Sequence, residues 1–125
     1  MKVLLSIKPE FVDKILNGTK RFEFRKGVFK NDKVKSVVIY ATMPVGMVVG
    51  EFNIQSIFSG SPSEVWNETS EYAGISKSFF DSYYEGREKA VAIEIGDVTK
   101  FDIPLPLDAL GENITPPQSY RYLYT

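Results

Sequence analysis

Two residue types are missing from this chain of 125 residues, which contains no histidine and no cysteine. Without cysteine there is no thiol nucleophile, and without either residue there is no Cys/His zinc site. The absence of histidine also removes the side chain that most often transfers protons near neutral pH. Catalysis or charge recognition must therefore use lysine, arginine, carboxylates or hydroxyl groups.

Long hydrophobic segments are missing as well. The longest apolar runs, residues 37–41 and 47–49, are far shorter than the roughly 20 residues of a membrane-spanning helix. At the N-terminus one lysine, Lys2, precedes a run of only three apolar residues, which is not the pattern of a signal peptide. We therefore expect a cytoplasmic protein with no membrane partner.

No linker, internal repeat or low-complexity segment divides the chain. Its length is close to the commonest domain size, and its contents of 43% hydrophobic and 14% aromatic residues are typical of a globular protein. We expect one domain over residues 1–125, built around one core.

The charges are segregated along the chain, although the net charge is only −1. Residues 1–36 contain ten basic and four acidic side chains, whereas the remainder contains five basic and twelve acidic ones. This asymmetry allows one positive face that would attract phosphate groups. An equally good interpretation is a set of solvated lysines with no ligand.

Hydrophobic periodicity and capping residues predict about six strands and three helices in mixed order. Extended segments are expected at residues 3–7, 20–25, 34–42, 47–58, 90–95, 101–107 and 119–124. Helices are expected to begin at Pro9, at the capping box Ser61 to Glu64, and after Ser76. This order predicts an α+β fold around a curved or barrel-like sheet.

Residues 18–26 carry the most informative charge pattern. Strict alternation would place Lys20 and Glu23 on opposite faces of a strand, so a shared site requires Lys20 to precede the regular pairing or a bulge to intervene. A lysine acts as a nucleophile or base only when its pKa falls well below about 10.4. The alternative is a surface ladder in which Arg21, Glu23 and Arg25 form weak ion pairs.

Two other segments could contribute to a site. Residues 116–122 begin with a rigid Pro-Pro pair, and the five residues after it provide an amide, a hydroxyl, two tyrosines and an arginine. Groups of this kind bind single-stranded nucleic acids. The alternative is a terminal strand that closes the sheet. The polar loop containing Glu68 and Glu71 could place a carboxylate beside a cleft, or remain solvated without a role.

Residues 18–25, GTKRFEFR, match the GxKxxExR signature of ASCH domains without a gap. The segments LLSIKPEF, IYATMPVG, SPSEVWNETSEYAGIS and PPQSYRYL also resemble the small stand-alone ASCH proteins of bacteria, archaea and phages. The resemblance covers essentially the whole chain. It implies a PUA-like fold, in which a small β-barrel of about six strands is flanked by short helices.

The resemblance also implies a function, the binding of RNA or of a nucleotide or nucleoside in a basic cleft lined by the signature. Lys20, Glu23 and Arg25 would lie at this cleft, and no cofactor or metal is implied. The ligand-binding residues would be Ser6, Lys8, Arg25, Tyr40, Gln118, Ser119 and Arg121.

An alternative activity comes from similar small bacterial amidohydrolases, which cleave N4-acetylcytidine with a lysine, a threonine and a glutamate. Lys20 matches the lysine, Glu71 is nearest to the glutamate, and Glu23 stands where these enzymes have threonine. Catalysis would then involve Lys20, Glu23 and Glu71. A third possibility is that the signature determines the fold and binds no ligand.

Overall fold

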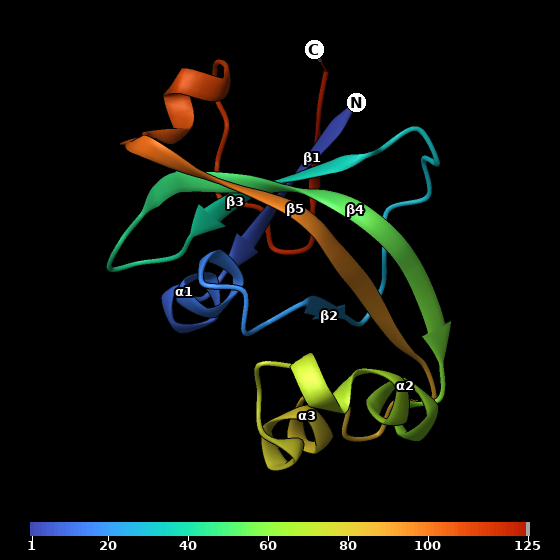
Figure 1. The fold of residues 1–125 in the computed structure, drawn as a ribbon. Helices are drawn as coiled ribbons and strands as arrows, with labels where there is room; N and C mark the ends of the chain where they lie inside the picture. The colour runs from blue at the N-terminus through green and yellow to red at the C-terminus, as the bar shows by residue number, and fades with distance from the viewer. Residues whose placement is uncertain (125) are drawn as a thin grey trace.

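The computed structural model describes residues 1–124, which form a six-stranded mixed sheet with three short α-helices (Figure 1). The strands are β1 (Lys2–Ile7), β2 (Phe22–Arg25), β3 (Ser36–Ala41), β4 (Met47–Gly60), β5 (Ala90–Leu105) and β6 (Arg121–Leu123). The helices are α1 (Pro9–Leu16), α2 (Pro62–Thr69) and α3 (Lys77–Tyr83), with 3-10 turns η1 (Ser70–Tyr72) and η2 (Leu107–Leu110). The predicted α+β class is therefore confirmed.

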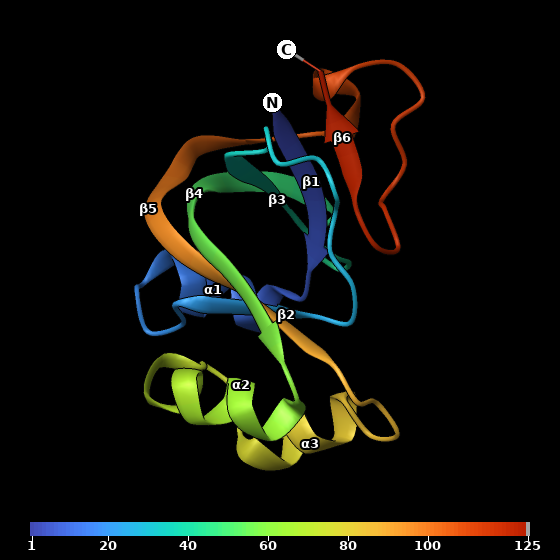
Figure 2. The ribbon, with the colours of Figure 1, turned by 90° about the vertical axis from the view of Figure 1, so that its right-hand side faces the viewer.

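The sheet curves like the wall of a barrel but does not close. Its strand order is β2-β5-β4-β3-β1-β6, so β2 and β6 are its two edges, and only the β1–β3 pair is parallel. The two longest strands, β4 and β5, bend together away from the rest of the sheet (Figure 2). Three register shifts along their ladder, the first beside Gly50, account for this curvature because bulges increase local twist.

The expected break between residues 95 and 101 is wrong. Residues 90–95 and 101–107 were expected to form separate strands, whereas β5 is continuous from Ala90 to Leu105. Continuity follows from β4, which pairs with β5 from Gly60↔Ala90 to Val48↔Leu105. Pro104 lies in the half of β5 whose only partner is β4, where a missing backbone donor is tolerated.

The predicted helix starts are confirmed. Ser61 and Glu64 form a reciprocal capping box at α2, and the Ser76 hydroxyl accepts a hydrogen bond from the backbone N–H of Phe79 at α3. None of the helices in the described part of the chain is long and apolar enough to span a membrane.

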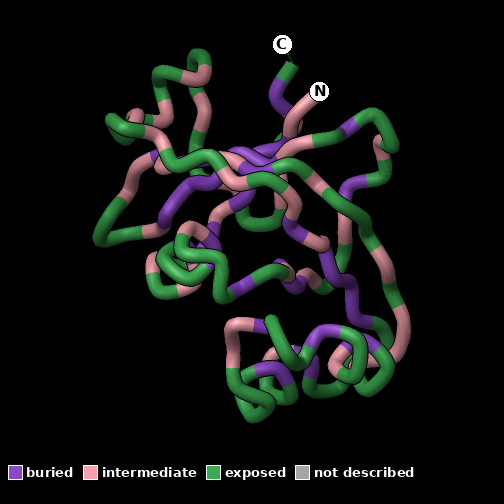
Figure 3. Tube along the Cα trace, viewed as in Figure 1, coloured by how far each residue is buried: buried purple, intermediate pink, exposed green. Residues whose placement is uncertain are grey.

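Two hydrophobic clusters position the site. The first joins α1 to the inner face of the sheet and includes Leu5, Ile15 and Ile39. The second packs α2 and α3 under β2 and β5, where the Phe24 ring meets the Phe80 ring edge-on at 5.2 Å. Buried residues accordingly concentrate along the strands and on the inner sides of the helices (Figure 3). The segment from α1 to β2 passes between these clusters.

Candidate functional site

A cavity of about 280 Å³ opens between the start of α1, the β2 segment and α3. The N-terminal part contributes Ser6, Lys8 and Phe11, and the signature segment contributes Lys20, Glu23 and Arg25. Beyond these, the wall contains Ile75, Phe79, Tyr83 and Gln118. Four segments that are distant in the sequence therefore meet at one hollow with cationic, anionic and aromatic groups.

Lys20 occupies the buried side of this cavity. It precedes β2, and the N–H of the next residue, Arg21, donates to the Tyr72 carbonyl at 2.9 Å instead of pairing within the sheet. This position frees Lys20 from strand alternation, so that it lines the same cavity as Glu23. Lys20 is only 2% exposed, and its Nζ donates to the Ala73 carbonyl at 2.8 Å.

The amino group of Lys20 lies against aromatic rings. Its Nζ is 4.8 Å from the centroid of Phe24 and 5.3 Å from that of Phe11. Burial lowers the pKa of Lys20 from 10.5 to about 8, against the opposing effect of the Glu23 carboxylate and with a further contribution from Lys14. At pH 7 about one molecule in ten then carries a neutral amine, which can accept a proton.

Gly74 makes room for the Lys20 stem. A Cβ at position 74 would lie 2.9 Å from Lys20 Cδ and closer still to Cβ and Cγ, and the backbone there has a φ of +70°. The Gly74 carbonyl accepts a hydrogen bond from Lys14 Nζ at 3.1 Å. Residues 72–74 therefore close over the lysine through backbone contacts, which only a glycine at position 74 permits.

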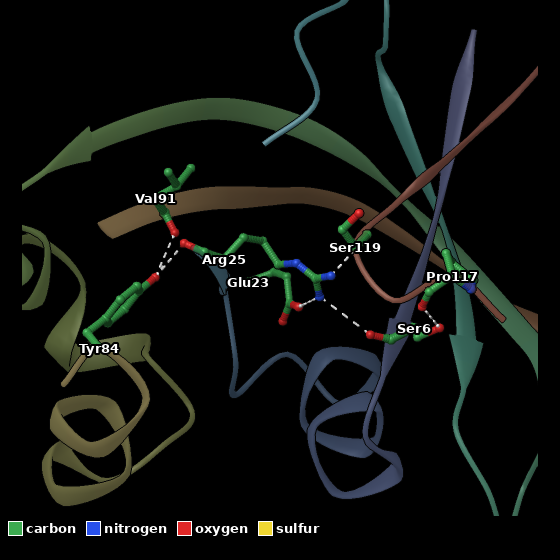
Figure 4. Close-up of polar contacts among 7 residues, drawn as sticks. All are labelled: Ser6, Glu23, Arg25, Tyr84, Val91, Pro117 and Ser119. Carbon is green, nitrogen blue, oxygen red and sulfur yellow. Dashed lines mark hydrogen bonds and ion pairs between the residues drawn. The ribbon is translucent and has the colours of Figure 1, made fainter. Parts of the chain in front are cut away.

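Glu23 and Arg25 form an ion pair on the wall of the same cavity. Arg25 Nη1 lies 3.0 Å from Glu23 Oε2, and both side chains are mostly buried. The same guanidinium donates to the Ser6 carbonyl at 3.4 Å and to the Ser119 carbonyl at 2.6 Å (Figure 4). The Tyr84 hydroxyl donates to the Arg25 carbonyl at 2.8 Å, which fixes the backbone of this residue too. Arg25 therefore joins β2, β1 and the C-terminal segment.

Aromatic rings and cations alternate at the rim. Lys8 Nζ lies 5.3 Å from the Phe79 centroid, and Lys26 Nζ lies 4.8 Å from the Tyr83 centroid. Burial is the main cause that raises the pKa of Tyr83, so its hydroxyl remains a neutral donor and acceptor. The rim therefore offers positive charge beside flat apolar surfaces.

Not all expected site residues are at the cavity. Those that line it are Ser6, Lys8, Lys20, Glu23, Arg25 and Gln118, while Ser119 contacts Arg25 through its carbonyl. Tyr40 is next to Ser6 in the β1–β3 register but is buried in an apolar cluster, at 5% exposure. Arg121 is exposed on β6 and lines a different hollow. Glu71 is exposed in η1 and does not line the cavity.

The aromatic wall could not be predicted from the sequence. Phe79, Phe80, Tyr83 and Tyr84 recur at helical spacing after Ser76, which predicts a single apolar stripe on that helix. In the structure Phe80 and Tyr84 are buried against the sheet, whereas Phe79 and Tyr83 line the cavity. A stripe this wide contacts both the core and the cavity. Helical spacing alone does not show which of its residues face the core and which face the cavity.

Within residues 1–124, no group of three or more aspartate or glutamate side chains is close enough to hold a metal ion. The groups available for chemistry at the cavity are the Lys20 amine, the Glu23 carboxylate, the Arg25 guanidinium and the Tyr83 hydroxyl. Together they could bind an anionic ligand and move a proton.

Comparison with known proteins defines the class of this domain. The ASCH domain family model matches residues 5–99. The chain is 34% identical over 125 residues to the ASCH domain-containing ribonuclease of Zymomonas mobilis, covering 98% of this chain and 84% of the relative. The crystal structure of ASCH from Zymomonas mobilis matches with a TM-score of 0.91 and 31% identity, covering 98% of this chain and 87% of that one.

The chain therefore belongs to the ASCH domain family and has its PUA-like fold, which confirms the resemblance found in the signature. It also matches the large ribosomal subunit protein uL22 of Ureaplasma parvum, with 38% identity over 93 residues. That match covers 74% of this chain but spans only 29% of the ribosomal protein.

Proposed function

We propose that this ASCH domain binds single-stranded RNA, places one nucleotide in the cavity around Lys20, and cleaves the strand there. The carrying observation is the buried Lys20 amine, whose pKa burial lowers to about 8, in one cavity with the Glu23–Arg25 pair. The ribonuclease from Zymomonas mobilis, similar over 98% of this chain, supports the choice of substrate.

The rim supports binding of single strands in preference to duplexes. Lys8 and Lys26 can neutralise phosphates, and the rings of Phe79 and Tyr83 beside them can stack on bases. A base enters a cavity only when it is unstacked, which costs least in a strand that is already single. Affinity should fall with added salt because each neutralised phosphate releases roughly 0.7 of a counterion.

The cleavage step uses the neutral fraction of Lys20. The amine accepts the proton of a ribose 2′-hydroxyl, whose oxygen attacks the adjacent phosphorus while the bond from phosphorus to the 5′-oxygen breaks. The leaving oxygen takes a proton from solvent and Lys20 returns its proton to solvent, so the products are a 2′,3′-cyclic phosphate and a 5′-hydroxyl end. Positive charge on the cavity wall stabilises the additional negative charge that develops on phosphate in the transition state.

The test combines binding and cleavage on one RNA. A labelled single strand and its duplex are titrated by fluorescence anisotropy, and the same strand is incubated and resolved on a denaturing gel. Lys20→Met keeps the length of the stem but removes the amine, so it should bind RNA and fail to cleave it. Lys100→Met, at an exposed position on β5, is the matched control and should cleave normally. Equal cleavage by both variants would refute the role of Lys20.

The second candidate is hydrolysis of an N4-acylated cytidine, favoured by the same buried lysine, whose pKa is lowered, beside apolar rings. Lys20 would attack or activate water toward the amide carbonyl, and the Glu23 carboxylate would carry the proton. Glu71 would act only if its exposed segment moved toward the cavity. Release of acetate from N4-acetylcytidine by the wild-type protein, and its loss in Lys20→Met, would favour this activity, whereas no release would remove it.

A further inference from the structure

We infer that Gln118 is the residue that reads the base of the bound nucleotide, because it lines the cavity and its backbone is held by hydrogen bonds on both sides. This inference rests on the proposed binding of RNA at the same cavity. It adds sequence selectivity, which neither the rim cations nor the aromatic rings provide.

The two clamps come from different elements. On one side, the Ser6 hydroxyl donates to the carbonyl of Pro117 at 2.8 Å. On the other side, Arg25 Nη2 donates to the carbonyl of Ser119 at 2.6 Å. Figure 4 shows both bonds meeting the C-terminal segment from β1 and β2. The carbonyls immediately before and after Gln118 are therefore both fixed.

The clamps are themselves held rigidly. Arg25 Nη1 bonds to the Ser6 carbonyl at 3.4 Å and to Glu23 at 3.0 Å, so the two clamping residues form one network. Ser6 is paired with Tyr40 of β3, and β6 pairs with the same strand from Lys2 to Leu4. Pro117 and the proline before it also restrict the backbone as it approaches Gln118.

Downstream of the clamps, the chain is anchored by aromatic contacts. The Tyr120 ring meets the Phe29 ring at 5.9 Å and the Tyr122 ring at 5.3 Å, each nearly edge-on. Gln118 therefore lies between two residues, Pro117 and Ser119, whose carbonyls are held by hydrogen bonds. A backbone held in this way loses little further conformational freedom on binding, which favours discrimination between ligands.

The chemistry of the amide suits a base edge. Gln118 lines the cavity, and within residues 1–124 its side-chain amide has no hydrogen-bond partner. An amide presents one acceptor and two donors in a plane, so it can form two parallel hydrogen bonds with a base. Lysine and arginine at the rim provide donors only, and phenyl rings provide neither donors nor acceptors. The Tyr83 hydroxyl on the same wall is also a neutral donor and acceptor, but it is a single atom, whereas the Gln118 amide holds its donor and its acceptor side by side in one plane and can pair with both on one base.

The test measures base preference separately from binding. A pool of single-stranded RNA hexamers randomised at every position is selected by binding to the intact protein and sequenced. The best hexamer and its single-base variants are then titrated individually. We expect the wild-type protein to disfavour at least one single-base change by about 5-fold or more, the lower limit for one bidentate contact.

Gln118→Ala should bring this ratio close to one, and Gln118→Glu should shift it toward other bases because the amide donor is lost. Gln55→Ala, at an exposed position on β4, is the matched control and should retain the wild-type ratio. Ser6→Ala removes one clamp and should give an intermediate ratio while the fold is retained by circular dichroism, and Ser6→Thr should restore the preference.

The outcomes separate the two proposals. Binding of RNA by the wild-type protein without base preference, or a preference that survives Gln118→Ala, overturns the role of Gln118 and leaves RNA binding intact. Absence of binding to every hexamer at low salt overturns the proposed function, and with it this inference.

Discussion

The contact between Gly74 and Lys20 makes a quantitative prediction about how the site is assembled. Gly74→Ala adds a methyl group that would lie within 2.9 Å of Lys20 Cδ and closer to the two preceding carbons. It also forces alanine into a backbone with φ of +70°. The conformational cost is about 1–2 kcal/mol, and overpacking adds about 1–3 kcal/mol. We expect a loss of about 2–5 kcal/mol of unfolding free energy.

The chain provides a matched control for the backbone contribution to this loss of unfolding free energy. Gly86 has a φ of +73°, and a Cβ there would meet nothing within 4 Å. Gly86→Ala should therefore lose only about 1–2 kcal/mol. The difference between the two variants isolates the contact with Lys20, and urea unfolding followed by tryptophan fluorescence measures it.

A double-mutant cycle sharpens the assignment. If the methyl group collides with the Lys20 stem, Gly74→Ala should be less destabilising in a Lys20→Ala background, where that stem is absent. Equal losses in Gly74→Ala and Gly86→Ala, or an unchanged loss in the Lys20→Ala background, would refute this account of how the lysine is enclosed.

Three further predictions follow from the charges. Burial lowers the folded-state pKa of Lys20 to about 8 from 10.5, so the unfolded chain binds more protons between these values. The unfolding free energy of wild type relative to Lys20→Met should therefore rise from pH 8 to 10.5, by up to about 3 kcal/mol, and stay constant below pH 7. Lys8→Ala and Lys26→Ala should each reduce the salt slope of RNA binding by about 0.7, measured by anisotropy. Arg25→Lys cannot hold all three of its partners, so residues 117–119 should become more accessible to proteases at an unchanged fold by circular dichroism.

Each of these predictions has a distinct failure. A pH-independent difference between wild type and Lys20→Met would mean that the lysine is not desolvated. An unchanged salt slope in Lys8→Ala and Lys26→Ala would remove the rim cations from the RNA path. Wild-type protease resistance in Arg25→Lys would show that the C-terminal segment does not depend on the guanidinium.

Local signals in the sequence predicted the parts of the fold that local interactions determine. The capping box at Ser61 and the cap at Ser76 each involve residues within one helical turn, and both are present. The continuity of β5 could not be predicted in this way, because it depends on pairing with β4, whose partner residues are up to 57 positions away in the register Val48↔Leu105. Strand ends are determined by such non-local partners.

At the site, too, the sequence predicted what a local motif determines and not what long-range contacts determine. The sequence motif predicts Lys20, Glu23 and Arg25 at one cleft. Strand alternation also indicates that Lys20 can share a site with Glu23 only if it precedes the regular strand pairing or a bulge intervenes. The enclosure of Lys20 by residues 72–74 and the clamping of Gln118 involve contacts over more than 50 positions. No periodicity reports contacts of that range, and the α3 stripe did not reveal that Phe79 and Tyr83 face the cavity.

The most direct test of the account is the pH dependence of RNA cleavage. Single-turnover rates on one labelled single strand are measured from pH 6 to 9 for the wild-type protein and for Lys20→Met. We predict that the wild-type rate rises with pH and levels off above about pH 8, where burial has placed the pKa of Lys20, and that Lys20→Met binds the strand without cleaving it. Cleavage by Lys20→Met at the wild-type rate would contradict the central role of the buried lysine.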